Sequence, residues 1–518
     1  MSLASQVESL VLQPFFLLPL ILFLTYLLWS FFLRPSSNSR SRSPPLPPGP
    51  RTLPLVGNLH SLDPELHTYF ASLSAIHGPV CKLQLGGTLC IVISSPSAAR
   101  AVLKDNDVIF ANRDVPVAGR CATYGGRDIV WTPYGPEWRN LRKVCVLKML
   151  SNNTLDSVYE LRRSQMRKMV GYFYRKSGSE VNVGEQIFLT VLNVITSMMW
   201  GETVKGEERE RIGAEFRQVV GEMTALLGLP NISDFFPALR RFDLQGVEKK
   251  MKVLVERLDT IFERVIEQRL EMDKSGGAGS GNKDFLQFLL KLKEEEDSKT
   301  PLEMVHIKAL LMDMVVGGTD TTSNTVEFAM AEILNKPAVV AKIQDELDRV
   351  IGKDSIVEES HIHGLPYLRA VMKEFLRLHP PLPLMVPHCP SETCTVEGYT
   401  VPKGSRVFVN VWMIHRDPKV WDKPDVFDPE RFADGNVDFS GNDFSYIPFG
   451  SGRRICAGVA MGERMVMYAL ATMLHLFEWK LPGDGKIDLT EQFGIVMKKK
   501  TPLVAVPSPR LSDPRLYE

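Results

Sequence analysis

The longest apolar stretch of the chain lies near its N-terminus. Residues 10–33 contain no charged side chain, and about 20 apolar residues are enough for a helix to cross a bilayer. No Lys or Arg precedes the stretch and bulky residues end it, which is not typical of a cleaved signal peptide. The pattern therefore predicts a transmembrane anchor over residues 1–33. Arg34, Arg40 and Arg42 follow it, and the positive-inside rule then predicts a single-pass topology with the following domain in the cytosol.

A polar linker is predicted over residues 34–50. Residues 36–43 are rich in Ser and Arg, which is typical of a flexible tether. Residues 44–50 are mostly proline, and proline fixes φ and disfavours helix, so we expect a stiff, extended piece. Composition leaves open whether this piece is a plain spacer or a strut that orients the next domain against the membrane.

Beyond residue 50 the apolar positions recur mostly at helical spacing. Helices are predicted over residues 152–171, 247–272, 301–334, 366–378 and 459–477. Strand-like alternation predicts a hairpin over residues 80–94 around Gly86-Gly87, and short strands over residues 399–410. No internal repeat or strong interdomain break is visible. We therefore expect one domain over residues 51–518 that is mainly α with small β-sheets.

Composition excludes several functional classes. The 518 residues contain 61 Lys and Arg against 61 Asp and Glu, so there is no electrostatic reason to expect a nucleic-acid partner. A hydrophobic content of 44% and a charged content of 24% argue against a disordered chain. The seven cysteines form no CxxC pair, which argues against a zinc ribbon or a disulfide scaffold.

One cysteine stands in a chemically special context. Residues 449–458 read Phe-Gly-Ser-Gly-Arg-Arg-Ile-Cys-Ala-Gly and precede an apolar helix. Glycine lets the backbone approach a flat ligand closely, and a cysteine at the start of a helix is favoured as thiolate. A thiolate can be an axial ligand of haem iron, and Arg454 could meet a carboxylate of the same cofactor. The alternative is a glycine-rich turn with an incidental buried cysteine.

The spacing Phe449-x-x-Gly452-x-Arg454-x-Cys456-x-Gly458 resembles the haem-binding signature of the cytochrome P450 superfamily. The resemblance extends over nearly the whole chain. It is closest to the microsomal enzymes of plant specialised metabolism, in a subgroup that includes sesquiterpene hydroxylases. It implies a haem-thiolate monooxygenase with haem b, Cys456 as the iron ligand, and Phe449, Arg454 and Gly458 as further cofactor-binding residues.

The resemblance also implies partners and a location. Molecular oxygen is a substrate, and electrons come from NADPH through a flavoprotein reductase. We expect the enzyme at the endoplasmic reticulum membrane, in contact with membrane lipid. Arg139 and Lys143 are then expected on the cysteine side of the haem, where they would receive an acidic face of the reductase; a solvated basic face is the alternative.

Three further motifs acquire roles from the resemblance. Residues 317–322, Gly-Gly-Thr-Asp-Thr-Thr, are expected to interrupt a long helix and leave room for a small ligand, with Asp320 and Thr321 as a catalytic proton-relay pair. Trp138 and Arg142 lie on one face of a helix and would hold a haem propionate, as would His388. Packing residues, a solvated arginine and an ordinary loop histidine are the alternatives.

A fourth motif is expected to be structural. Glu374 and Arg377 are three residues apart on one helix. An isolated pair of this kind is usually a surface ion pair. The resemblance instead implies a buried network with Arg431 that supports the haem pocket.

Substrate identity follows only from the resemblance, which implies substrate-facing segments at residues 115–124, 221–229, 310–316, 383–386 and 493–496. Their side chains are mostly apolar: Leu226, Leu227, Val315, Leu384, Met385, Ile495 and Val496. This favours a small apolar terpenoid, with a flavonoid or other phenolic as the main alternative. A non-catalytic haem-binding protein, and a membrane protein with a reactive non-haem cysteine, are alternatives of another class.

Overall fold

The computed structural model describes residues 44–201, 206–274, 284–294, 301–435, 437–483 and 486–518, together with Pro19, Ile21 and residues 23–26. The predicted anchor therefore lies mostly outside the described residues, as do residues 36–43 of the linker. The few described residues of the anchor are helical and exposed.

Helices form most of the described chain. The α-helices are α2 (Leu66–His77), α3 (Pro96–Arg100), α4 (Asp107–Phe110), α5 (Val117–Ala122), α6 (Pro136–Val144), α7 (Asn152–Ser157), α8 (Tyr159–Arg175), α9 (Val183–Trp200), α10 (Gly206–Gly228), α11 (Ile232–Phe235), α12 (Val247–Lys274), α13 (Phe285–Glu294), α14 (Met304–Leu334), α15 (Pro337–Val350), α16 (Pro366–Leu378), α17 (Val411–Ile414) and α18 (Val459–Leu476). Short 3-10 or π turns are η2 (Leu59–Ser61), η3 (Ala101–Asp105), η4 (Cys145–Met149), η5 (Pro237–Phe242), η6 (Glu359–Gly364), η7 (Pro429–Phe432), η8 (Gly452–Arg454) and η9 (Pro514–Tyr517).

The strands of the described residues form small sheets. They are β1 (Val80–Leu85), β2 (Thr88–Ile93), β3 (Val181–Asn182), β4 (Cys394–Val396), β5 (Tyr399–Val401), β6 (Arg406–Val409), β7 (Phe477–Lys480), β8 (Glu491–Gln492), β9 (Lys498–Lys499) and β10 (Val504–Pro509). The sheet orders are β1-β2-β6, β3-β10-β7, β4-β5 and β8-β9. β1 and β2 pair antiparallel from Val80 opposite Ile93, and β6 joins β2 in parallel with Cys90 opposite Arg406.

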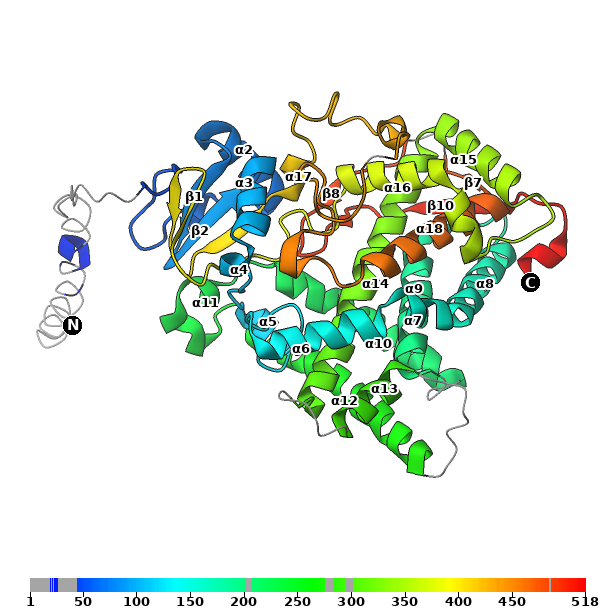
Figure 1. The fold of residues 1–518 in the computed structure, drawn as a ribbon, viewed down its shortest axis with the longest axis horizontal. Helices are drawn as coiled ribbons and strands as arrows, with labels where there is room; N and C mark the ends of the chain where they lie inside the picture. Colours follow the sequence, from blue (N-terminus) through cyan, green and yellow to red (C-terminus); the bar gives the residue numbers. More distant parts are fainter. Residues whose placement is uncertain are drawn as a thin grey trace, which may run out of the picture.

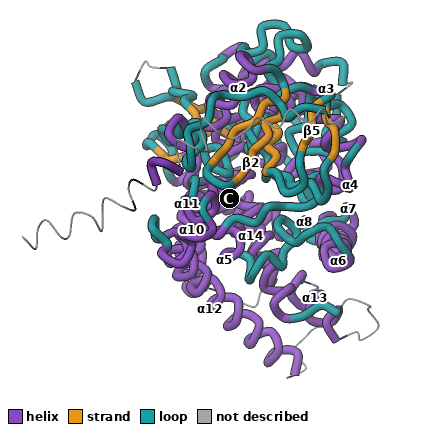
Figure 2. The backbone as a smooth tube through the Cα atoms, turned by 90° about the vertical axis from the view of Figure 1, so that its left-hand side faces the viewer, coloured by secondary structure: helices purple, strands orange, loops and turns teal. Residues whose placement is uncertain are grey.

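The sheet β1-β2-β6 lies at one end of the molecule with α2, and the long helices fill the other end (Figure 1). Figure 2 shows the same division from the side, with β2 and β5 among loops and with α10, α12, α13 and α14 gathered on the opposite side. α14 runs through the interior, where it packs against α9, α16 and α18. This mainly helical fold with small sheets matches the sequence prediction.

α14 differs from its prediction in two ways. It begins at Met304, where Glu303 forms a capping box with His306, and not at Pro301. It is also continuous through Gly317-Gly318, so the expected interruption does not occur. The glycines and threonines act more locally, because Thr321 donates its hydroxyl to the Gly317 carbonyl at 2.6 Å, which competes with the helix hydrogen bonds.

Other boundaries are closer to prediction. The helix over residues 366–378 and the hairpin β1–β2 around Gly86-Gly87 are confirmed. The helix predicted over 152–171 is two helices, because α7 ends before Val158 and α8 begins after it. Among the described residues, α9 is long and apolar enough to span a membrane, but 72% of that window is buried, which is typical of a core helix.

Candidate active site

A cavity of about 300 Å³ lies between the loop that carries Cys456 and the middle of α14. We call it the distal cavity. Predicted site residues from distant parts of the chain meet at its wall: Arg142, Thr321, His388, Phe449, Arg454, Cys456 and Gly458. Trp138 and Asp320, which the motifs also predict, do not line it. The fold thus brings most of the predicted site together.

Hydrogen bonds within the loop before α18 position the Cys456 side chain. The Cys456 N–H donates to the Phe449 carbonyl at 2.9 Å, and the Gly458 N–H points at Sγ at 3.3 Å. Gly452 has φ +68, and a Cβ there would lie 2.2 Å from the Leu103 carbonyl oxygen, so only glycine fits. Of the seven cysteines, Cys456 alone is exposed, but its side chain opens onto the interior distal cavity and is still surrounded by protein.

The free thiol is less acidic than its position at the start of a helix predicts. Burial raises the pKa of Cys456, although the Gly458 N–H and the Arg142 guanidinium oppose this rise. The helix start therefore does not by itself make a thiolate here. Metal binding does, because a coordinating thiol gives up its proton to the ion.

Three arginines at the cavity wall form no ion pair within the part of the chain that the structure describes. Arg113, Arg142 and Arg454 form no ion pair with a carboxylate among the described residues, and their guanidinium groups donate to main-chain carbonyls instead. Burial lowers the pKa of Arg113 to about 9 and that of Arg454 to about 10. Buried cations without counter-ions are costly. A cofactor that brings carboxylates next to a thiolate-bound metal fits this set, and haem has both features.

Three of the predicted cofactor-binding residues have other contacts in this structure. The Trp138 indole N–H donates to the Ile129 carbonyl at 3.0 Å, and the Arg454 guanidinium lies 4.5 Å from the Trp138 ring centroid. His388 is buried and donates from Nδ1 to the Phe110 carbonyl at 2.9 Å. Burial, followed by the charge of Arg113, holds the pKa of His388 well below its usual range, so it is neutral. A role of these three residues toward a propionate stays a prediction.

The acid–alcohol pair of α14 is split between two environments. Thr321 lines the distal cavity. Asp320 is buried on another side of the helix, where its carboxylate lies 3.0 Å from the Lys498 ammonium and accepts from Asn324 at 3.1 Å. Lys498 is one-third exposed, so the carboxylate of Asp320 connects toward solvent while Thr321 faces the cavity.

The predicted glutamate–arginine network is present and buried. Arg377 donates to both carboxylate oxygens of Glu374 at 2.7 and 2.9 Å, and both side chains are 0% exposed. Arg431 lies 3.4 Å from Glu374, and the Asp428 N–H donates to it at 2.8 Å. Arg377 also donates to the His415 carbonyl at 2.8 Å. The network fixes α16 to the segment that leads to the Cys456 loop.

A second, smaller cavity of about 110 Å³ adjoins the distal cavity. We call it the access cavity. Several predicted substrate-facing residues line it: Leu227, Leu384, Met385 and Ile495. Met385 lines both cavities, whereas Val315 is fully buried and lines neither. The predicted segments therefore divide between two chambers that meet at Met385.

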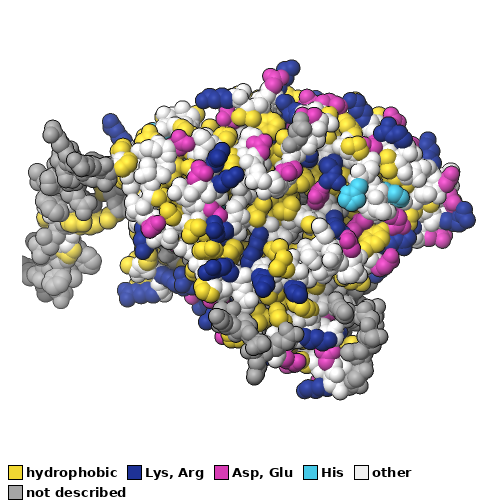
Figure 3. Space-filling view, in the orientation of Figure 1, with side chains coloured by type: hydrophobic (Ala, Val, Ile, Leu, Met, Phe, Trp, Pro, Cys, Tyr) yellow, Lys and Arg dark blue, Asp and Glu magenta, His cyan; other side chains and the backbone are white. Residues whose placement is uncertain are grey.

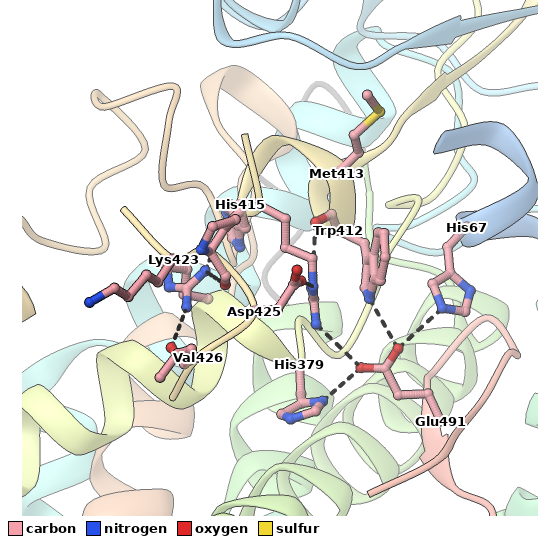
Figure 4. A network of polar contacts seen from close by, with 12 residues as sticks. His67, His379, Trp412, Met413, His415, Lys423, Asp425, Val426 and Glu491 are labelled. Atoms are coloured by element: carbon pink, nitrogen blue, oxygen red, sulfur yellow. Dashed lines mark hydrogen bonds and ion pairs between the residues drawn. The ribbon is translucent and has the colours of Figure 1, made fainter. Parts of the chain in front are cut away.

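A buried cluster holds the segment that leads to residues 493–495 of the access cavity (Figure 4). Glu491 lies 2.6 Å from His379 and 3.2 Å from His67, and the Trp412 indole N–H donates to it at 3.0 Å. His379 also reaches Glu332 of α14 at 3.0 Å. The cluster therefore ties this wall of the access cavity to α2, α14, α16 and α17.

Two residues of this site, Arg113 and Lys498, are not predicted from the sequence, and Asp313 is predicted only as part of the substrate-facing segment 310–316. Arg113 and Asp313 line the distal cavity, and Lys498 faces Asp320. No local motif marks them, because each gains its role from contacts with segments far away in the chain. Arg113, for example, donates to the Val386 carbonyl at 2.5 Å.

The thiol, the unpaired arginines and the cavity under α14 define a haem-thiolate enzyme, and comparison with known proteins gives its family. A family model described as Cytochrome P450 matches residues 47–506. The chain is 41% identical over 501 residues to a flavonoid 3'-monooxygenase of Crocosmia x crocosmiiflora, covering 94% of this chain and 97% of the relative. It is 40% identical over 472 residues to a geraniol 8-hydroxylase of Catharanthus roseus, covering 90% and 94%.

The fold is also that of a solved structure, a zebra fish cytochrome P450 with progesterone. The TM-score is 0.76 at 26% identity, and the match covers 86% of this chain and 100% of that chain. The chain belongs to the cytochrome P450 family. The predicted fold class, monooxygenase activity and haem cofactor with NADPH-derived electrons are thereby confirmed.

Proposed function

We propose that this monooxygenase sits at the endoplasmic reticulum membrane and hydroxylates a small apolar terpenoid. The observation that carries the substrate class is the lining of the distal cavity above Cys456. It presents apolar side chains, among them Ile195, Met314, Leu382 and Val386. The polar groups Thr321 and Asp313 are engaged by the Gly317 carbonyl and the Ile129 N–H. An apolar pocket selects by shape and favours a hydrocarbon-rich substrate.

A flavonoid is the second candidate. The similarity to a flavonoid 3'-monooxygenase at 41% identity supports it as much as the similarity to a geraniol 8-hydroxylase at 40% supports a terpenoid. The cavity lining is what favours the terpenoid, since it is mostly apolar and its Thr321 and Asp313 side chains already have partners in the protein.

The residues of the site have separate proposed roles in cofactor binding and proton transfer. Cys456 would hold the haem iron, and haem supplies oxygen activation when it is bound. The Cys456 thiolate would favour this chemistry by donating electron density to the iron. Arg113, Arg142 and Arg454 would compensate the carboxylates of the cofactor. The Thr321 hydroxyl would pass protons into the cavity, and Asp320 would supply them from the side of Lys498.

The test is a direct comparison of substrates. The full chain in membranes with a plant flavoprotein reductase and NADPH receives geraniol, a sesquiterpene hydrocarbon or a flavanone under labelled molecular oxygen. We expect mass spectrometry to find one labelled oxygen atom in a terpenoid product. Hydroxylation of the flavanone with no terpenoid product would overturn the substrate assignment.

The reductase is proposed to dock on the face that covers Cys456. A surface hollow there is lined by Cys456, by the basic residues Arg142, Arg369 and Lys373, and by the acidic residues Asp438 and Glu463, of which Glu463 pairs with Arg369. Arg139 and Lys143 of α6 are exposed beside it and add to its positive charge. Figure 3 shows Lys and Arg side chains gathered over the region where α6 lies in Figure 1. A basic face next to the cysteine suits an acidic partner and speeds its encounter.

A further inference from the structure

Two carboxyl groups meet at the wall of the distal cavity, outside the residues that the motifs explain. Asp313 belongs to α14, one turn before Gly317, and lines the cavity. Asp128 precedes the lining residues Ile129 and Val130 and is 0% exposed. The two carboxyl groups are neighbours, because the N–H of Ile129, the residue that follows Asp128, donates to Asp313 Oδ2 at 2.9 Å.

A hydrogen bond between the two carboxyl groups would require a proton on one of them. The Trp131 N–H donates to Asp128 Oδ1 at 2.8 Å, and the Ile129 N–H donates to Asp313 Oδ2 at 2.9 Å. Asp128 Oδ2 is buried and has no hydrogen-bond partner among the described residues. Two carboxylates are both acceptors, so they can bond only if one of them carries a proton. A proton on Asp313 satisfies the orphaned oxygen of Asp128.

No cation neutralises the pair instead. Arg113 and Arg454 face Asp128, and Cys145 faces Asp313. Neither arginine forms an ion pair with either carboxyl among the described residues, since both donate to main-chain carbonyls. Two buried like charges in contact are strongly disfavoured. Burial raises the pKa of both groups, and the charge of Asp128 raises that of Asp313 further.

Asp128 belongs to a segment, residues 128–132, whose main-chain carbonyls accept hydrogen bonds from several site residues. The Ile129 carbonyl accepts hydrogen bonds from Trp138 and Arg454. The Val130 carbonyl accepts one from Arg113, and the Thr132 carbonyl accepts one from Arg454. The link from this segment to α14 runs through the Ile129 N–H and the two carboxyls.

We infer that Asp128 and Asp313 share one proton, and that this singly protonated pair is a positioning device that holds residues 128–132 against α14 as the wall of the haem site. The inference concerns the positioning of this chain's own wall and does not depend on the substrate class proposed above.

Paired variants at position 313 test the inference. In Asp313→Asn the amide oxygen accepts from Ile129 and the amide N–H donates to Asp128, so the link survives without a titrating proton. In Asp313→Ala the link is lost and Asp128 is stranded. We expect haem transfer from the full-length holoenzyme to excess apomyoglobin to be about tenfold faster in Asp313→Ala, because a buried acceptor is left unsatisfied, and near the wild-type rate in Asp313→Asn.

Two measurements report the proton itself. Infrared spectra of the wild type at neutral pH should show the carbonyl stretch of a protonated carboxylic acid, which Asp313→Asn removes. A group that holds its proton longer when folded loses stability as pH rises. The melting temperature of the wild type should therefore fall more steeply than that of Asp313→Asn from about pH 4, the unfolded carboxyl pKa, upward.

Glu346→Gln is the matched control, because Glu346 is a buried carboxylate outside the distal cavity that accepts from the Tyr367 and Leu368 N–H groups. It should leave both the infrared band and the haem transfer rate unchanged. The inference fails if the band persists in Asp313→Asn, or if Asp313→Ala holds haem as firmly as the wild type.

Discussion

At the scale of single residues, Thr321 is the most specific test of the proposed chemistry. Its hydroxyl faces the distal cavity and donates to the Gly317 carbonyl. We predict that Thr321→Ala keeps haem and substrate binding but forms at least about tenfold less product per NADPH, because positioned proton transfer commonly contributes that much or more. The missing reducing equivalents should appear as hydrogen peroxide. Ser323→Ala is the control, since Ser323 makes the same kind of bond to the Thr319 carbonyl but does not line the cavity. Equal coupling in both variants would contradict the role.

The same scale shows what a sequence can reveal of this site. Cys456, Phe449 and Gly458 are predictable because one contiguous loop carries them, and the backbone demands glycine at Gly452. Arg113 is not predictable in this way, because its role arises from contacts with residues far away in the chain, such as the Val386 carbonyl. Asp320 is found by its motif, yet its partner Lys498 lies 178 positions along the chain, and no local pattern joins them.

At the scale of elements, the Glu374–Arg377–Arg431 network joins α16 to η7. Removing one partner strands a buried charge, which costs about 3–5 kcal/mol. We predict that Glu374→Ala lowers the melting temperature and the haem content of purified protein, and not only its turnover. Glu430→Ala is a close control, because Glu430 belongs to the same η7 but is half-exposed and pairs with the exposed Lys342. Full haem loading and normal stability in Glu374→Ala would remove the structural role.

A second prediction at this scale concerns pH and the Glu491 cluster (Figure 4). Burial opposes the charge of His379, but hydrogen bonds to Glu332 and Glu491 outweigh it and raise its pKa. Burial also opposes the charge of Glu491, but its bonds to His379 and His67 hold its pKa far below the usual range. The histidine contribution is present below about pH 6.5 and lost above its folded pKa, and the glutamate contribution is present above about pH 4.3 and lost in acid.

Melting curves across pH check this. The stabilisation of the wild type over Glu491→Gln should be largest between these two limits and should shrink on either side. A constant difference from acid to alkaline pH would show that the cluster does not titrate as an ion pair.

Element boundaries show why periodicity alone is insufficient. α16 is predicted to the residue, because Pro366 can begin a helix and the apolar face is strongly periodic. The division between α7 and α8 at Val158 is not, since apolar spacing continues across it. The continuity of α14 is set by packing against α9, α16 and α18, which outweighs the weak helix propensity of Gly317 and Gly318.

At the scale of the whole molecule, exposed apolar side chains gather beside the access cavity. Leu229 lines that cavity and is 54% exposed, and Phe242 and Leu244 follow at 56% and 60%. Leu53 and Leu55 are similarly exposed. Their segment lies near that of Leu229, Phe242 and Leu244, because both segments contact the β1–β2 hairpin. Gly57 pairs with Leu85 of β1, and the N–H of Gly87 in the hairpin turn donates to the Phe235 carbonyl. We call these five residues the apolar rim. Exposed apolar side chains on neighbouring segments of this kind are typical of a membrane or partner contact.

The rim predicts how the protein meets the bilayer, with the access cavity opening toward lipid so that an apolar substrate enters without crossing water. Full-length Phe242→Trp in vesicles of brominated phosphatidylcholine should lose more tryptophan fluorescence than the wild type, because bromine quenches only what it contacts in the acyl region. Val426→Trp is the matched control: Val426 is 46% exposed, but it lies between α17 and η7, away from the rim. Equal extra quenching at both positions, or none at position 242, would show that the rim does not enter the membrane, and the substrate would then have to reach the access cavity from the aqueous side.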